Sequence, residues 1–301
     1  MEKRVIIGID LGGTFIKGGA VNTSGEVICS LTVPTPKSRE VQEVCEAIAK
    51  VVEDICKQTS LSFEEVIGVG VACPGLIDRE KGVVISSSNL RWFETPFKKI
   101  LQEKCHFPIA LINDAVAALL GEMKFGAGKG EKNVVMLTLG TGVGTGVWKD
   151  GRLLDPIEVG HIVMDPTGEQ CACGRCGCFE TYASATALVR ETKRAIEREE
   201  TQMKQEETVT GETVFRYYLT DKTAQRVLSE YLQRLACGIV NATRIFFSET
   251  VILGGGICSS LQPFISQLQD EINKETVFPI RLLTAKNKNH AGVIGAAALW
   301  R

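Results

Sequence analysis

The sequence has no run of roughly 20 apolar residues, which is the length that a membrane-spanning helix needs. It has no excess of basic charge either, since 34 Lys and Arg stand against 36 Asp and Glu and the two signs are interspersed. A broad basic face for a phosphate backbone is therefore not expected. Met1 to Arg4 lead straight into an apolar run, without the pattern of a signal peptide. We expect a soluble, cytoplasmic protein that binds neither membrane nor nucleic acid.

Motifs of several enzyme classes are also missing. No G-x-x-x-x-G-K-S/T occurs, which argues against a P-loop. Gly140 to Gly142 form a G-x-G, but the third glycine is wrongly spaced for a dinucleotide site and Trp148 continues a strand where a helix should open. There is no G-x-S-x-G and no H-E-x-x-H, so neither of these motifs supports a hydrolase.

What is present is enough chain for two lobes: 301 residues at 44% hydrophobic, against about 100–200 residues for a single domain. Apolar, β-branched runs between turn residues predict strands, and apolar residues at helical spacing predict helices. These elements follow a similar order in the two halves: strands at 4–10, 16–21, 27–33 and 66–73 with a helix at 41–56, then strands within 134–147 and at 250–253 with a helix at 223–247. The pattern predicts an α/β fold with mixed sheets.

The crossing between the two halves is expected near residue 120, because the second series of strands begins soon afterwards. We therefore predict an N-terminal lobe at 1–120 and a C-terminal lobe at 121–290. A small, apolar helix at 291–301 is expected to return to the first lobe.

Cysteine usage separates into two kinds. Most of the eleven cysteines are scattered through apolar segments, which suits buried thiols in a reducing compartment. Cys171, Cys173, Cys176 and Cys178 instead crowd together, and such crowding indicates a metal before it indicates disulfides. Zinc is commonly held by three cysteines and one histidine. His161 with Cys171, Cys173 and Cys178 is one such set, and the four cysteines without histidine are the alternative.

Three glycine-rich turns each follow an apolar strand: Asp10 to Thr14, Leu139 to Gly146, and Leu253 to Gly256. Glycine lets backbone N–H groups converge on phosphate oxygens without side chains in the way. One such turn alone is as easily a hairpin or a bulge. Three in this order, across two similar halves, favour a phosphate site.

The order of the turns resembles the ATP-binding plan of the actin, hexokinase and Hsp70 superfamily, in which two ribonuclease-H-like lobes hold the nucleotide in the cleft between them. The resemblance implies that Asp10 organises Mg²⁺, although an aspartate there can also simply cap the turn. It implies the following nucleotide contacts: Gly12, Gly13, Thr14 and Lys17 near the transferred phosphate, Gly140, Thr141, Gly142 and Gly144 near the other phosphates, and Gly254, Gly255 and Gly256 near the adenosine.

A second motif is more specific. Glu158-Val-Gly-His161 followed by the C-x-C-G-x-x-G-C-x-E run from Cys171 to Glu180 resembles the hallmark of the ROK family of repressors and sugar kinases. The resemblance spans the whole chain. It implies that Glu158, His161 and Glu180 bind sugar hydroxyls while a structural zinc, in the motif 161–178, holds their loop. A hydrogen-bonded core histidine and a site without metal are the alternatives for His161.

The catalytic base is expected where a strand ends, at Asn113-Asp114. An aspartate at such a junction is as readily a helix N-cap. The family resemblance favours Asp114 as the proton acceptor, with Asn113 positioning the hydroxyl. Gly75 and Asn89 match further sugar-contact positions, although a loop asparagine often bonds only its own backbone.

The resemblance implies ATP-dependent phosphorylation of a hexose hydroxyl, with C6-OH as the first candidate in a glucokinase-like reaction, in a homodimer or homotetramer. Residues 151–157 form a shorter loop than relatives carry before the E-x-G-H motif. Because that loop is expected near the sugar, the identity of the sugar stays open: glucose is the default, with mannose, allose, fructose, N-acetylglucosamine or N-acetylmannosamine as alternatives. The rival functions are a non-catalytic sugar sensor or repressor, and a kinase that uses polyphosphate as its donor.

Overall fold

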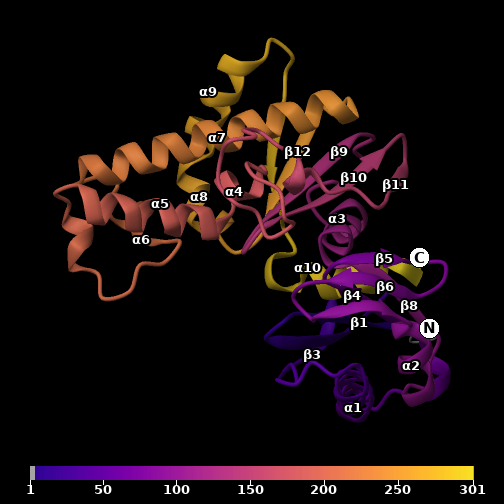
Figure 1. Cartoon of the computed structure of the whole chain (residues 1–301). Helices are drawn as coiled ribbons and strands as arrows, with labels where there is room; N and C mark the ends of the chain where they lie inside the picture. Colours follow the sequence, from indigo (N-terminus) through magenta and orange to yellow (C-terminus); the bar gives the residue numbers. More distant parts are fainter. Residues whose placement is uncertain (1–3, 301) are drawn as a thin grey trace. The chain divides into compact units, whose positions relative to one another are not determined.

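The computed structural model describes residues 4–300, and the chain divides into two compact units (Figure 1). Unit 1 comprises Met1–Gly130 and Lys286–Arg301, and unit 2 comprises Glu131–Ala285. The chain thus passes between the units twice. The boundary predicted at residue 120 falls inside a helix, Asp114–Phe125, which packs within unit 1 and carries that unit on to Gly130.

Unit 1 is built on a five-stranded sheet and a small three-stranded sheet. Its strands are β1 (Val5–Leu11), β2 (Phe15–Val21), β3 (Val27–Pro34), β4 (Val66–Cys73), β5 (Leu76–Asp78), β6 (Val83–Ser87), β7 (Trp92–Thr95) and β8 (Ile109–Asn113). Its helices are α1 (Val41–Thr59), α2 (Phe97–Lys104), α3 (Asp114–Phe125) and α10 (Ala291–Ala297), the last followed by a 3₁₀ turn at Ala298–Trp300. The predicted C-terminal helix is therefore shorter than expected.

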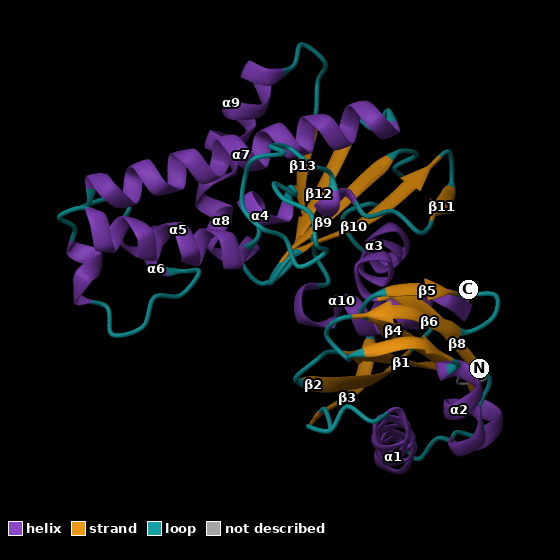
Figure 2. Cartoon of the chain, in the orientation of Figure 1, coloured by secondary structure: helices purple, strands orange, loops and turns teal. Residues whose placement is uncertain are grey.

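The large sheet of unit 1 has the order β3-β2-β1-β4-β8. β1, β2 and β3 are antiparallel, whereas β1, β4 and β8 run parallel. Helix α1 covers one face with the predicted apolar residues, including Ile48 and Ile55, which are fully buried. Helix α10 packs on β1 and β4, and Figure 2 shows it on the side of the sheet opposite α1.

Unit 2 repeats this plan. Its strands are β9 (Val134–Leu139), β10 (Val143–Lys149), β11 (Arg152–Leu154), β12 (Thr250–Gly254) and β13 (Arg281–Thr284), and its helices are α4 (Glu180–Ala183), α5 (Ala185–Arg198), α6 (Thr213–Tyr217), α7 (Lys222–Phe246), α8 (Cys258–Leu261) and α9 (Ile265–Glu275). The sheet order is β11-β10-β9-β12-β13, with three antiparallel strands followed by parallel pairing to β12 and β13. The predicted α/β fold with two similar halves is confirmed.

Helix α7 is the centre of the unit 2 core. It begins at Asp221, whose side chain accepts the Ala224 N–H at 2.9 Å, and it ends where Phe247 adopts a left-handed conformation. Its buried face includes Leu228, Leu232 and Leu235, which pack with strands β9 and β12 in one apolar cluster. Within residues 4–300, no helix combines the length and the hydropathy that a membrane crossing requires.

The packing of α10 against α3 depends on Gly295. A Cβ on Gly295 would lie 1.7 Å from the backbone oxygen of Ala117, and backbone cannot move aside as a flexible side chain can. We expect Gly295→Ala to lower the Tm by about 5 °C or more, because overpacking a core costs roughly 1–3 kcal/mol. Gly211→Ala is the matched control, since its nearest neighbours would lie at 3.9 Å. Thermal unfolding by circular dichroism checks both; equal Tm values would contradict this account.

Candidate active site

In unit 1, candidate residues gather at the carboxyl ends of the parallel strands. The register pairs Asp10 with Ala72 and Cys73 with Asn113, so the ends of β1, β4 and β8 form one edge. Ligands of open α/β sheets bind at this edge. Asp10 also lies opposite Lys17 of β2. Both residues belong to the predicted nucleotide contacts.

The first glycine turn is held by its own backbone. The Gly12 N–H donates to Phe15 O at 2.9 Å, and Gly12 O accepts the Thr35 hydroxyl at 2.7 Å. The turn therefore uses the Gly12 N–H itself, and within residues 4–300 it leaves the N–H groups of Gly13 and Thr14 for a ligand. Thr14 is exposed.

The Asp10 carboxylate packs against the start of α10. A Cβ on Gly292 would lie 2.5 Å from Asp10 Cγ, so only glycine leaves room for this carboxylate. Within the described part of the chain the carboxylate makes no hydrogen bond to the turn, which argues against the capping alternative. Burial raises the pKa of Asp10 to about 6; nearby Lys17 lowers it and the Asp114 charge raises it.

At the end of β8 the structure separates two roles that the sequence left open. Asn113, not Asp114, is the N-cap of α3: its side-chain oxygen accepts the N–H groups of Ala115 at 2.9 Å and Val116 at 3.1 Å. Asp114 is the first helical residue and remains partly exposed. Burial raises the pKa of Asp114, while the Ala115 N–H lowers it. A raised pKa makes this carboxylate a better proton acceptor.

The Asn113 side chain also reaches the Gly75 segment. Its amide nitrogen donates to Gly75 O at 3.0 Å. Gly75 has φ of 109°, and a Cβ there would lie 2.2 Å from Ser86 O, so glycine is required. Asn89 is exposed, and its backbone oxygen lies 3.8 Å from the Cβ position of Gly13. The Gly75, Asn89 and Asn113 segments thus lie beside the first glycine turn.

One further residue of this group lies outside the sequence motifs. Ser87, just before the predicted Ser88-Asn89 segment, is 3% exposed, and its hydroxyl has no hydrogen-bond partner within residues 4–300. Its Cβ lies 2.9 Å from the Cβ position of Gly75. Buried polar groups are nearly always paired, so a lone hydroxyl beside Gly75 indicates a place for a water or a ligand group.

In unit 2, the second and third glycine turns lie together. Gly255 has φ of 94°, and a Cβ on it would lie 2.3 Å from the oxygen of Leu139, the residue before Gly140. The second turn is closed by the Gly140 N–H, which donates to Gly142 O at 3.0 Å. Thr141 is exposed and Gly144 lies on β10, opposite Thr138. Gly254 is buried, whereas Gly255 and Gly256 are exposed.

Glu180 connects the second turn to the cysteine motif. Its Oε2 accepts the Val143 N–H at 3.4 Å and lies 2.4 Å from the Cβ position of Gly142. Its Oε1 accepts the Cys171 thiol at 3.1 Å and lies 3.6 Å from His161 Nδ1. Glu158 is exposed, directly before the 3₁₀ turn Val159–His161.

The metal candidate includes the histidine. The ligand atoms of His161, Cys171, Cys173 and Cys178 all lie within 4.8 Å of one another. Cys173 Sγ and Cys178 Sγ are 3.6 Å apart, close to the roughly 3.8 Å that tetrahedral zinc with bonds of about 2.3 Å requires. Cys176 lies outside this group and contacts Gln170 Oε1 at 3.4 Å. The geometry therefore favours the three-cysteine, one-histidine set.

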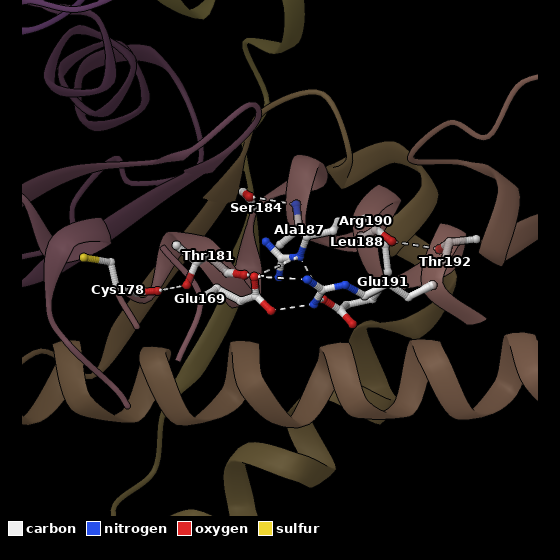
Figure 3. A network of polar contacts seen from close by, with 10 residues as sticks. Glu169, Cys178, Thr181, Ser184, Ala187, Leu188, Arg190, Glu191 and Thr192 are labelled. Carbon is white, nitrogen blue, oxygen red and sulfur yellow. Dashed lines mark hydrogen bonds and ion pairs between the residues drawn. The ribbon is translucent and has the colours of Figure 1, made fainter. Parts of the chain in front are cut away.

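A network of hydrogen bonds and ion pairs joins the loop of the candidate metal site to α5 (Figure 3). The Cys178 carbonyl accepts the Thr181 hydroxyl at 2.7 Å, and the Thr181 carbonyl accepts Arg190 Nη2 at 2.6 Å. Arg194 donates to both oxygens of Glu169, at 2.5 and 3.2 Å. A forked arginine–carboxylate pair is geometrically specific. The loop that carries Glu180 is therefore held at both ends by one helix.

The predicted site residues thus form one group in each unit. Asp10, the first turn, Gly75, Asn89, Asn113 and Asp114 belong to unit 1; the other two turns, Glu158, Glu180 and the cysteine motif belong to unit 2.

Comparison with known proteins agrees with these observations. The profile of the ROK family matches residues 6–301. A glucokinase from Thermotoga maritima is 33% identical, over 99% of this chain and 98% of that protein. A xylose repressor from Caldicellulosiruptor bescii is 29% identical, over 98% of this chain but 77% of its own length.

Solved structures give the same result. The crystal structure of a ROK family glucokinase from Streptomyces griseus, in complex with glucose and AMPPNP, has a TM-score of 0.82 and 27% identity, with 98% of each chain covered. The expected actin-like ATPase fold is thereby confirmed. On its E-x-G-H and cysteine motif, its fold and its full-length match, this chain belongs to the ROK family.

Proposed function

We propose that this protein is a sugar kinase that transfers the γ-phosphate of ATP to a hexose hydroxyl, with the C6-OH of glucose as the first candidate. One observation carries the proposal: Asp114, a partly exposed carboxylate with a raised pKa, lies at the same strand edge as Asp10 and the first glycine turn. The glucokinase relatives support it.

In the proposed reaction Asp114 accepts the proton of the sugar hydroxyl. The hydroxyl oxygen attacks the γ-phosphorus, and ADP leaves. No covalent enzyme intermediate is needed, because phosphoryl transfer requires alignment and charge neutralisation more than covalent help. Asn113 caps the start of α3 beside Asp114, and its amide nitrogen donates to Gly75 O. Gly75, Asn89, Glu158, His161 and Glu180 are the proposed sugar contacts.

The proposed nucleotide contacts are the three glycine turns with Lys17. Asp10 fits a magnesium site, since its carboxylate oxygens make no hydrogen bond within residues 4–300 and Mg²⁺ prefers one or two carboxylates together with substrate phosphates. Bound there, magnesium would neutralise phosphate charge. Asp10 and Lys17 then orient the phosphates from opposite strands of one hairpin.

His161, Cys171, Cys173 and Cys178 fit a structural zinc, because three thiols and an imidazole nitrogen complete a tetrahedral donor set. Zinc bound there would cross-link the loop that carries Glu180. All eleven cysteines are free thiols, as suits the proposed cytoplasmic location. A homodimer or homotetramer is proposed on the family resemblance alone.

The second candidate function is a sugar sensor without catalysis, which the xylose repressor relatives favour. Such a protein would bind sugar through the same residues and would need no proton acceptor.

The direct test is phosphorylation of glucose, mannose, allose, fructose, N-acetylglucosamine and N-acetylmannosamine, with ATP and Mg²⁺ or with polyphosphate. We expect ATP-dependent turnover with one preferred hexose. Sugar binding by calorimetry without turnover of any sugar would instead support the sensor.

Asp114→Asn keeps the size of the side chain but cannot accept the proton. We expect kcat to fall about 10²–10⁴-fold, the usual contribution of a general base, while the sugar dissociation constant changes little. Asp270→Asn is the control, on an exposed aspartate of α9 in unit 2 outside the proposed site, and it should keep kcat. Turnover by Asp114→Asn at the unsubstituted rate would remove the assignment.

Cys178→Ser removes one proposed zinc ligand, whereas Cys176→Ser alters a thiol outside the set. We expect Cys178→Ser to lose its zinc and to raise the KM for sugar by about 10–100-fold, because the loop that carries Glu180 loses its cross-link. Cys176→Ser should keep both. Metal analysis after dialysis measures the zinc content; zinc loss from both variants would favour the four-cysteine set.

A further inference from the structure

Glu122 of α3 is a buried carboxyl group that the proposed reaction does not use. It is 0% exposed, and no Lys, Arg or His forms an ion pair with it within residues 4–300. Burying a carboxyl group is costly unless hydrogen bonds satisfy it. Its partners therefore explain why the residue is present.

Four backbone N–H groups converge on Glu122. Its Oε2 accepts Ala127 N at 2.6 Å and its Oε1 accepts Asn287 N at 2.7 Å. Its backbone oxygen accepts Gly126 N and Gly128 N, both at 3.0 Å. Gly126 folds directly over the carboxyl group, because a Cβ on it would lie 1.9 Å from Oε2.

These partners flank the two places where the chain passes between the units. Residues 126–128 precede the first crossing, after Gly130, and Asn287 follows the second crossing, after Ala285. Glu122 therefore bonds to both connecting segments on their unit 1 side.

On the unit 2 side each segment is fixed again almost at once. Ala285 N donates to Leu253 O at 2.8 Å, which leaves only Lys286 between the last bond in unit 2 and the bond to Glu122. In the first segment, Glu131 pairs with Arg281 at 2.6 Å. Lys129 and Gly130 remain between, and Gly130 has φ of 87° with no atom within 4 Å of its Cβ position.

We propose that Glu122 is a positioning residue that ties the two connecting segments together, so that they bend as one hinge at Lys129–Gly130 and at Lys286 during turnover. The proposal rests on the proposed function, because a reaction that uses residues of both units depends on the two segments that join them. Hinges of this kind involve a few residues at the ends of elements, far from the chemistry. With both segments anchored on one side chain, neither bends without the other.

Glu122→Gln tests the coupling. Glutamine has the same shape but only one acceptor oxygen, so its amide nitrogen must face one of the two backbone N–H groups. We expect faster hydrogen–deuterium exchange, by about tenfold or more, in both 126–128 and 286–288 of the otherwise native protein. We also expect kcat to fall about tenfold. Unchanged exchange in either segment would overturn the proposal.

Two controls separate coupling from simple instability. Lys124→Gln changes an exposed residue of the same helix. Ile48→Val removes a methylene group from a buried residue of α1 in the unit 1 core, away from either segment. Both should keep kcat and the exchange of the two segments. A fall in kcat for Ile48→Val equal to that for Glu122→Gln would show that lost stability, not coupling, lowers turnover, and would also overturn the proposal.

The result of the hydrogen–deuterium exchange experiment does not depend on the proposed function. If the unsubstituted protein phosphorylates no hexose, the sugar kinase assignment fails, while exchange in 126–128 and 286–288 still decides whether Glu122 joins the two segments.

Discussion

Direct backbone contact between α10 and its neighbours is the constraint on which unit 1 depends. A Cβ on Gly8 of β1 or on Gly70 of β4 would lie 1.9 Å from a carbonyl oxygen of α10. The same helix requires Gly295 against α3 and Gly292 against Asp10. One helix from the end of the chain thus sets the position of the central strands, of α3 and of the Asp10 carboxylate together. Because α3 begins directly after Asn113 with Asp114, the close packing of α10 positions the core of unit 1 and the candidate site residues together.

Much of this architecture could be predicted from local sequence. Buried strands such as β4 and β12 are nearly continuous apolar runs, and α1 has clear helical periodicity. The three strands β5, β6 and β7 and the edge strands β11 and β13 were not predicted, because short strands acquire their pairing from tertiary contacts rather than from pattern. The division expected near residue 120 falls inside α3, whereas the glycines at 126, 128 and 130 that follow the helix lie at the end of unit 1.

The candidate site also has parts that the sequence predicts and parts that only the tertiary contacts reveal. Cys171, Cys173 and Cys178 could be proposed as metal ligands from their close spacing, with His161 nearby in the sequence, and the structure brings the four side chains together. Which of Asn113 and Asp114 caps α3 could not be read from the residues alone, since both residue types cap helices and only the hydrogen bonds distinguish them. Ser87 and Glu122 gave no signal at all, because their significance lies in contacts that no spacing encodes.

In unit 2, the side chain of Glu180 contacts both the second glycine turn and the cysteine motif. One carboxylate oxygen lies against the second glycine turn, at Val143 N, and the other lies between Cys171 and His161. The Gly142 position has no space for a side chain between turn and carboxylate. A shift of the cysteine loop must therefore move Glu180 against the turn. Arg190 and Arg194 of α5 bond to both sides of that loop, so the geometry of the glycine turn also depends on these two arginines.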